Sequence, residues 1–215
     1  MIAFSGIDCS GKSTQIAMLT KLLSERKKRT EVIWSRGGYT PGIEFIKRIL
    51  RRGKKVSKEE RIAYSANINS NPAKRKVLFI AGLIDLWFYY SIVLRIKDIG
   101  KIVICDRYVW DTYIDFKMKY GEYQFEKGFW WNLLLKTMVK PNPSICFFIP
   151  AEESMRRSSL KEEPFPEPID VRQERLQWYM KELKNNRWNH IIDATQDINS
   201  VFENVIKILE DAKTI

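Results

Sequence analysis

The stretch that most constrains this chain lies close to its beginning, from Gly6 to Thr14, and reads Gly-Ile-Asp-Cys-Ser-Gly-Lys-Ser-Thr. It fits the pattern G-x-x-x-x-G-K-[ST], whose backbone cradles phosphate groups. The apolar run at 2–5 predicts a buried strand before it, and the apolar spacing from 13 to about 28 predicts a helix after it. Strand, glycine-rich loop and helix in this order are the context that the motif requires, so the sequence predicts a nucleotide phosphate site.

Each part of such a loop has a physical task. The glycines let the backbone turn tightly and direct N–H groups at phosphate oxygens, and the following helix adds its positive N-terminal end. We expect Lys12 to reach the β and γ phosphates of ATP and the Ser13 hydroxyl to bind Mg²⁺. The residues expected to bind ATP are Gly6, Ile7, Asp8, Cys9, Ser10, Gly11, Lys12, Ser13 and Thr14.

Composition narrows the class of protein. The net charge of +11 over 215 residues favours anionic partners such as nucleotides, nucleic acid or an acidic membrane surface. The three cysteines, Cys9, Cys105 and Cys146, show no paired or zinc-binding spacing, which indicates reduced thiols in a cytoplasmic protein. A single histidine, His190, argues against a histidine-based metal site or catalytic triad. Because the loop's strand begins at once, we expect no signal peptide.

Further strand patterns follow the loop and alternate with helical ones. They lie at 31–35, 101–105, 145–149 and 191–193. The alternation predicts an α/β fold of three layers, a five-stranded parallel sheet with helices on both faces. We expect one domain over 1–215, with a mobile lid at about 151–168, where a Pro-Phe-Pro-Glu-Pro run interrupts any helix.

The segment from Val77 to Leu94 is almost wholly apolar, with one charge at Asp85. Its length approaches the roughly 18 to 20 residues that span a bilayer. A carboxylate at its middle is costly in lipid, and a helix that is apolar all round also suits a core or a subunit interface. We therefore expect a buried helix that also forms a dimer interface, and no membrane span.

Together these motifs resemble the thymidylate kinase family of P-loop nucleoside monophosphate kinases over nearly the whole chain. The matching stretches are the phosphate loop with its acid, the turn Arg36-Gly37-Gly38 with the family's Glu-Pro lost, Gly100 to Tyr108 with its Asp-Arg-Tyr signature, and Ile192 to Thr195. The resemblance implies the three-layer P-loop kinase fold, ATP and Mg²⁺ as cofactors, and a homodimer through the helix 77–94.

Two arginines are candidates for the acceptor phosphate. Arg36 and Arg107 stand at the carboxyl ends of predicted strands, where open α/β sheets bind ligands, and their planar cations suit a phosphate. Asp106 is expected either to hold Mg²⁺ or to orient Arg107. Asp8 is expected to contact the metal or an acceptor hydroxyl, or to shape the loop.

The resemblance adds further acceptor contacts and shows where this chain departs. Phe79 matches the family's stacking ring and Tyr108 completes the signature, so both are candidate substrate residues. Leu83, however, stands where the family has an arginine that reads thymine, and Asp111-Thr112 replaces a serine pair. Ile114-Asp115-Phe116 stands for Ala-Tyr-Gln, and the spacing from Phe79 to Gly100 is about two residues longer than usual.

The catalytic candidates are Lys12, Asp8, Arg107, Arg156 and Arg157. Some family members carry an arginine inside the phosphate loop and others take one from the lid. The loop interior here has neither arginine nor lysine, so we expect Arg156, Arg157 or Lys161 of the lid to contact ATP.

The sequence thus favours ATP-dependent phosphoryl transfer to a nucleoside monophosphate, with dTMP, giving dTDP, as the first candidate. One alternative is a kinase-like protein that acts on another pyrimidine nucleotide or a nucleoside. Another is a nucleotide-gated NTPase that binds nucleic acid through the basic run 47–61, although no aromatic-interleaved pattern accompanies it. A third is a homologue that binds nucleotide without turnover.

Overall fold

A computed structural model describes residues 1–34, 71–161 and 167–215 of the chain. The chain divides into two compact units. Unit 1 comprises Met1–Arg36, Lys97–Gly121 and Lys140–Ile215, and unit 2 comprises Gly37–Ile96 and Glu122–Val139. The described residues of unit 1 form the sheet and the helices that cover it, and those of unit 2 are helical.

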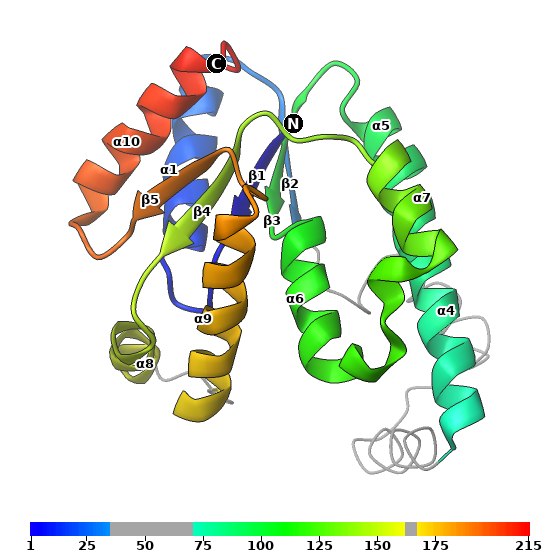
Figure 1. Ribbon diagram of the computed structural model, residues 1–215. Helices are drawn as coiled ribbons and strands as arrows, with labels where there is room; N and C mark the ends of the chain where they lie inside the picture. Colours follow the sequence, from blue (N-terminus) through cyan, green and yellow to red (C-terminus); the bar gives the residue numbers. More distant parts are fainter. Residues whose placement is uncertain (35–70, 162–166) are drawn as a thin grey trace, which may run out of the picture. The chain divides into compact units, whose positions relative to one another are not determined.

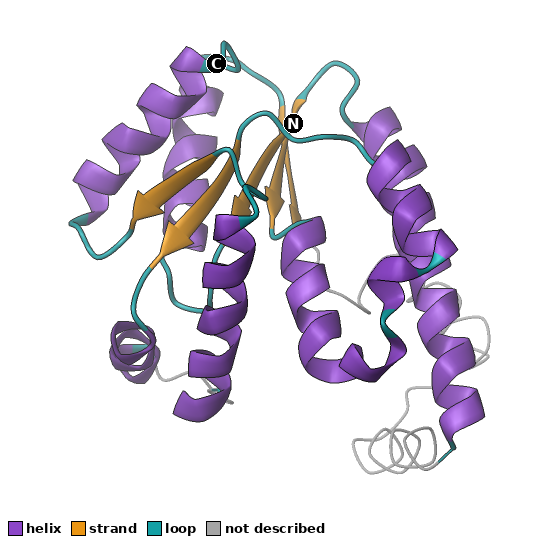
Figure 2. Ribbon diagram, in the orientation of Figure 1, coloured by secondary structure: helices purple, strands orange, loops and turns teal. Residues whose placement is uncertain are grey.

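The sheet of unit 1 contains five parallel strands. They are β1 (Ile2–Ser5), β2 (Thr30–Trp34), β3 (Ile102–Asp106), β4 (Ser144–Phe148) and β5 (His190–Asp193). Their order is β2-β3-β1-β4-β5, and every neighbouring pair is parallel, so the five strands point in one direction (Figure 2). The predicted three-layer α/β fold with a five-stranded parallel sheet is confirmed. Each strand lies within one residue of its predicted position.

Helices cover both faces of this sheet, as Figure 1 shows. Helices α1 (Lys12–Glu25) and α10 (Ile198–Asp211) lie on one face, and α6 (Val109–Tyr120) and α9 (Ile169–Lys184) lie on the other. Helix α8 (Ala151–Leu160) follows β4. A short 3₁₀ turn, Gly121–Tyr123, follows α6.

The strand at the centre of the sheet, β1, is buried along its whole length. Every residue of β1 is buried, as expected for a strand with neighbours on both edges and helices on both faces. Its Phe4 ring packs edge-to-face on Phe147 of β4, with 5.1 Å between ring centres. Helix α10 adds Val201, Val205 and Leu209, spaced as one helical face. A rigid central strand therefore carries the phosphate loop at its end.

Unit 2 is built from two helical segments that pack on each other. The first contains α4 (Pro72–Phe88), a π-helical turn (Tyr89–Val93) and α5 (Leu94–Lys97), whose last residue belongs to unit 1. The second contains a 3₁₀ turn (Phe125–Lys127) and α7 (Phe129–Thr137). The apolar segment 77–94 thus lies mostly in α4 and is interrupted by a π turn near its end.

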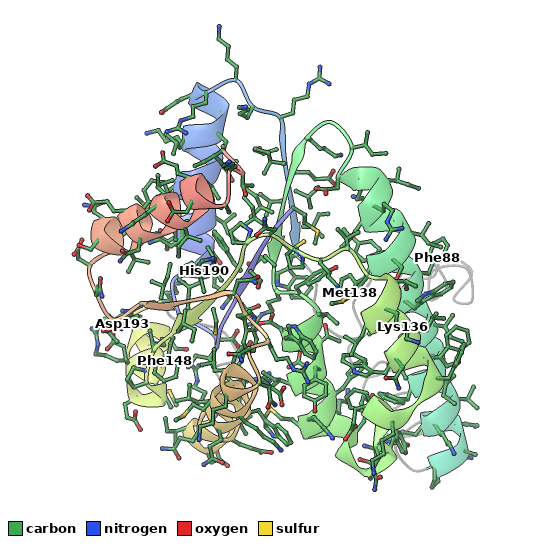
Figure 3. The ribbon with its side chains drawn as sticks, turned by 45° about the horizontal axis from the view of Figure 1, so that its top comes forward. Phe88, Lys136, Met138, Phe148, His190 and Asp193 are labelled. Atoms are coloured by element: carbon green, nitrogen blue, oxygen red, sulfur yellow. The ribbon has the colours of Figure 1, made fainter. Side chains whose placement is uncertain are left out.

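The long helical segment of unit 2 is only partly covered. Its 26 residues from Pro72 to Lys97 are long and apolar enough to cross a membrane by length and composition, and 44% of its most apolar stretch is buried. Leu86 and Tyr90 are fully buried, whereas Ile84 and Phe88 are 36% and 49% exposed. Phe88, labelled in Figure 3, projects outward from α4. The expectation of a buried helix therefore holds for one side of this segment only.

Candidate active site

The phosphate loop connects β1 to α1, and backbone geometry fixes its glycines. Gly6 has a φ of 140°, and a Cβ atom added there would lie 2.4 Å from the Phe147 carbonyl oxygen and 2.9 Å from Ser10 Oγ. Gly11 has a φ of 92° and stands as the N-cap of α1. Both values lie where side chains are disfavoured, so the two glycines of the motif are required by the turn itself.

Lys12 lies inside the loop and is almost fully buried, with 6% exposure. Its ammonium group donates to the carbonyl oxygens of Gly6 at 2.9 Å and Ile7 at 2.8 Å, and to Ser10 Oγ at 3.2 Å. Burial lowers the pKa of Lys12 to about 8, and the neighbouring positive charge of Arg107 acts in the same direction. The loop therefore holds a cation that lacks a full negative partner, which suits it to a phosphate.

Arg107 follows β3 and points back under the loop. Its backbone φ is 74°, unusual for a residue with a side chain, and its N–H donates to the Phe4 carbonyl at 2.8 Å. The guanidinium donates to the Gly6 carbonyl at 3.1 Å and forms an ion pair with Asp8. Burial opposes its charge, but Tyr179, Asp8 and Asp111 together raise its pKa above the ordinary value.

Asp106 ends β3 directly before Arg107, and the charges of both Lys12 and Arg107 act on it. One of its oxygens, Oδ1, is buried without a hydrogen-bond partner. Burial raises the pKa of Asp106, while the charges of Lys12 and Arg107 lower it. A buried carboxylate oxygen without a donor is a site that a cation can fill. No cluster of three or more metal-binding side chains occurs among the residues that the structure describes.

These side chains share a pocket of about 160 Å³ at the carboxyl ends of β1 and β3. Its lining consists of Asp8, Cys9, Ser10, Gly11, Lys12, Ser13, Trp34, Asp106, Arg107 and Lys161. The sequence predicted all of these for the site except Trp34. That indole ends β2 beside Asp106 in the strand register, so its place at a strand end was the available signal.

The lid candidates differ in their contacts. Arg157 donates to Glu153 at 2.7 Å and to the Ala194 carbonyl at 2.9 Å, and its Nη1 lies 4.0 Å from where a Gly11 Cβ would be. Lys161 lines the pocket. Arg156 instead pairs with Glu153, and its side chain is 62% exposed. The structure thus brings Arg157 and Lys161 to the phosphate loop and leaves Arg156 in solvent.

Helix α8 is fastened to the phosphate loop by buried polar contacts that sequence reasoning did not find. Ser154 donates to the Asp8 carbonyl at 2.7 Å. Arg172 of α9, 1% exposed, donates to Ser154 Oγ at 2.6 Å, to Ser158 Oγ at 2.9 Å and to the Glu167 carbonyl at 2.9 Å. Nothing in the sequence marks Arg172, because its partners lie 5 to 18 residues away.

The remaining predicted residues lie elsewhere. Ile7 is buried beneath the loop and Thr14 is exposed on α1. Tyr108 is buried as the N-cap of α6, and Arg36 lies outside the described residues. Phe79 belongs to unit 2, where it is 7% exposed and its ring packs against two other aromatic rings, those of Tyr123 and Phe125.

The sheet and the site together define the class of protein to which this chain belongs. A parallel sheet of this order carries the phosphate loop on its central strand and an Asp-Arg pair on the next strand, as in a P-loop nucleotide kinase. A family model described as Thymidylate kinase matches residues 4–205. The chain therefore belongs to the thymidylate kinase family, whose members are nucleoside monophosphate kinases.

Individual relatives agree with this assignment over nearly their full length. The chain is 28% identical to a thymidylate kinase from Sulfurihydrogenibium sp. (strain YO3AOP1), covering 100% of this chain and 98% of the relative. It is also 28% identical to a thymidylate kinase from Thermosipho melanesiensis, with 97% and 96% covered. The solved structure of a thymidylate kinase from Ehrlichia chaffeensis superposes with a TM-score of 0.54 at 23% identity, covering 97% of each chain, which supports the fold.

Proposed function

We propose that this chain transfers the γ-phosphoryl group of ATP to a nucleoside monophosphate, with dTMP as the first acceptor. The observation that carries the proposal is one pocket that contains both the phosphate loop with Lys12 and the Asp106-Arg107 pair. One set of groups suits a donor triphosphate and the other an acceptor phosphate. The relatives named thymidylate kinase support dTMP.

Lys12 is suited to the donor phosphates. Its ammonium now donates to two loop carbonyls and a hydroxyl, all neutral acceptors. A phosphate oxygen is a stronger acceptor for a cation, so ATP would draw Lys12 toward its β and γ phosphates. Because phosphoryl transfer depends mainly on positioning and electrostatic stabilisation, this contact would contribute directly to the rate.

The residues fit the Mg²⁺ ion that the family uses with ATP. Ser13 and Asp106 both line the pocket, and the buried Oδ1 of Asp106 has no donor. Mg²⁺ is commonly held by one or two protein oxygens together with phosphates and water, so two ligands suffice. When bound, the ion supplies positive charge that neutralises the phosphate oxygens. Among the residues described, Ser13 and Asp106 are the ones that would hold it.

Arg107 is suited to the acceptor. In this structure its guanidinium pairs with Asp8, and it lines the pocket. An incoming monophosphate competes for the same cation and leaves the Asp8 carboxylate available for a hydroxyl or the metal. Tyr108 would support Arg107 from the helix start, and Phe79 remains the candidate stacking residue for the base. Arg36 remains the second candidate cation for the acceptor phosphate.

The lid proposal now centres on Arg157. Its contacts to Glu153 and to the Ala194 carbonyl hold it beside Gly11, where the phosphates of ATP would lie. Lys161 is one turn further along and lines the same pocket. We propose that Arg157 stabilises charge on the transferred phosphoryl group, as part of a lid at about 151–168, and that Arg156 has at most a supporting role.

We further propose that the protein acts as a cytoplasmic homodimer. The outward side of α4 and the π turn carries Ile80, Ile84, Phe88 and Ile92, four residues apart and each more than a third exposed. Apolar patches of this kind usually mark an interaction surface. The three cysteines are free thiols, which a reducing compartment maintains.

A panel of acceptors tests the proposed function. Purified protein is incubated with Mg²⁺-ATP and with nucleosides or their monophosphates, and ADP release is measured. We expect turnover with dTMP, with dUMP or another monophosphate within about tenfold, or roughly 1.4 kcal/mol. The weak base selectivity follows from Leu83 and Phe116, which stand where the family has polar residues. Better turnover with nucleosides than with monophosphates, or none with any nucleotide, would contradict the proposal.

A further inference from the structure

Asp111 of α6 lies at the centre of a buried polar network next to the phosphate loop. Its side chain has no measurable exposure. One carboxylate oxygen, Oδ2, accepts from Ser5 Oγ at 2.5 Å and from the Tyr108 N–H at 3.0 Å. The other, Oδ1, accepts from the Gly6 N–H at 3.4 Å and from the Tyr179 hydroxyl. A single side chain thus joins the end of β1, the start of α6 and the middle of α9.

The same carboxylate also acts on Arg107. Arg107 Nη1 lies 3.5 Å from Asp111 Oδ1 and 3.5 Å from the Tyr179 hydroxyl oxygen. Its other terminal nitrogen pairs with Asp8. Asp111 of α6 therefore contacts one terminal nitrogen of the guanidinium, and Asp8 of the phosphate loop contacts the other. A buried arginine with a left-handed backbone needs such fixed partners to keep one direction.

We propose that Asp111 is a positioning residue, which fixes the direction of the Arg107 guanidinium and couples it to the first turn of the phosphate loop. The inference rests on the proposed function, because it assumes that Arg107 binds the acceptor phosphate. The carboxylate accepts four hydrogen bonds and also faces a cation, which a neutral hydroxyl at this position could not do.

Asn is a sharp probe of this role because it preserves size and removes the charge. Each oxygen of Asp111 accepts from a backbone N–H, Oδ1 from Gly6 and Oδ2 from Tyr108. Whichever way an asparagine turns, its NH₂ group meets one of these fixed donors. Asp115 offers the matched control. It lies one turn further on the same helix and forms an ion pair with a different buried arginine, Arg175.

Calorimetric binding of dTMP, thymidine and ATP to the full chain provides the test. We expect Asp111→Asn to weaken dTMP binding about tenfold, or roughly 1.4 kcal/mol. Thymidine, which has no phosphate for Arg107, should bind as before, and ATP should change by less than about threefold. Asp115 pairs with Arg175 and acts on Arg107 only through its charge, so Asp115→Asn should weaken dTMP binding by much less than Asp111→Asn and leave thymidine and ATP unchanged.

Two further variants separate positioning from general damage. Tyr179→Phe removes only the hydroxyl that bonds to Asp111 and Arg107, and should weaken dTMP binding about threefold. In an Arg107→Lys background, which keeps the charge and loses the fork, Asp111→Asn should add nothing, because interacting residues are not additive. If Asp111→Asn fails to fold, Tyr179→Phe decides the question.

The outcomes distinguish the proposed role of Asp111 from the proposed function of the protein. Unchanged dTMP affinity in Asp111→Asn, an equal loss in Asp115→Asn, or a full loss in the Arg107→Lys background would overturn the role of Asp111 alone. A wild-type chain that binds dTMP no better than thymidine would overturn the proposed acceptor, and the inference with it. A selective loss for dTMP, shared in part by Tyr179→Phe, supports the inference.

Discussion

Around the phosphate loop, position is fixed largely by hydrogen bonds to buried charges. The helices α4 and α7 pack mainly through rings and aliphatic side chains, although Trp87 of α4 also donates to Thr137 of α7 at 3.1 Å. Lys12, Arg107 and Asp111 are all buried: Lys12 and Arg107 donate to the Gly6 carbonyl, and Asp111 accepts from the Gly6 N–H. Phe79 packs against Tyr123 and Phe125, with ring centres 5.2 and 5.7 Å apart. Hydrogen bonds specify direction more strictly than packing does, which suits the first region to chemistry, and the second region is the one for which we propose association.

The largest effect is expected at Lys12. Lys12→Ala should lower turnover by about 10²–10³-fold or more, the range seen when one charge-stabilising donor is lost. The fold should persist, because an unpaired buried cation is removed rather than created. Steady-state rates together with circular dichroism check both halves. Wild-type turnover in a folded variant would show that this loop does not bind the transferred phosphate.

Arg157 and Arg156 form a matched pair within the same region. Arg157→Ala should lower kcat about tenfold with a smaller rise in KM for ATP, the mark of an interaction made mainly in the transition state. Arg156→Ala should stay close to wild type, because its guanidinium pairs with Glu153 on an exposed surface. Equal effects from the two substitutions would mean that the contacts of Arg157 near Gly11 do not matter for catalysis.

For the outward side of α4, we predict a molecular mass in solution twice that of the single chain. A dimer of the 25.4 kDa chain should be seen by light scattering at micromolar concentration. Ile84→Glu places a charge in the middle of the outward stripe and should convert the dimer to a monomer. Ile198→Glu, also at an exposed apolar position but at the start of α10, is the control and should leave the dimer intact. A wild-type monomer would remove the proposed interface.

The smallest expected effect is a proton uptake by Lys12 when ATP binds. The pKa of Lys12 is lowered to about 8, so in the free protein about half of this group is deprotonated at pH 8. A bound phosphate favours the charged form and raises the pKa again, so ATP binding should take up about half a proton at pH 8 and much less at pH 6.5. Calorimetry in buffers of different ionisation enthalpy measures this uptake. Lys12→Ala should lose the pH-dependent part.

The lowered pKa of Lys12 also makes the free energy of unfolding depend on pH, in a direction that can be stated. Because the folded pKa of Lys12 lies below the unfolded value of 10.5, the unfolded chain binds more protons between about pH 8 and 10.5. This group therefore destabilises the fold fully below pH 8, and that destabilisation is relieved as pH rises through the window. The difference in urea midpoint between wild type and Lys12→Ala should shift accordingly, in favour of wild type at high pH.

The parallel sheet could be predicted from sequence, and so could the proximity of the phosphate loop to the Asp106-Arg107 pair, because both follow from short sequence patterns. Short apolar runs identify buried strands, and ligand groups at the carboxyl ends of parallel strands meet at one edge, as Lys12 and Arg107 do. The partners of Arg107 could not be predicted in this way. Asp8 and Tyr179 lie 99 and 72 residues away, and neither contact leaves a periodic signal.

The lid shows how a regular helix changes a site prediction. The sequence predicted a mobile lid at about 151–168, and the structure has a regular helix, α8, from Ala151 to Leu160 at its start. This helix aligns Arg157 with Lys161, four residues on, while Arg156 turns toward solvent. In unit 2, burial depends on tertiary contacts that an apolar run does not reveal, because within the same segment Tyr89 is 4% exposed and Val77 is 66% exposed.

The π turn at Tyr89–Val93 affects how many residues the helical segment of unit 2 contains. A π turn closes a longer ring than an α turn, so it takes in one extra residue while the residues on either side keep their rotational phase. The Tyr90 carbonyl accepts the Val139 N–H at 3.0 Å, which binds the turn to the segment after α7. A helix with such a turn can therefore accommodate one residue more than a uniform α-helix between the same two ends, and we infer that part of the roughly two-residue excess between Phe79 and Gly100 is accommodated here.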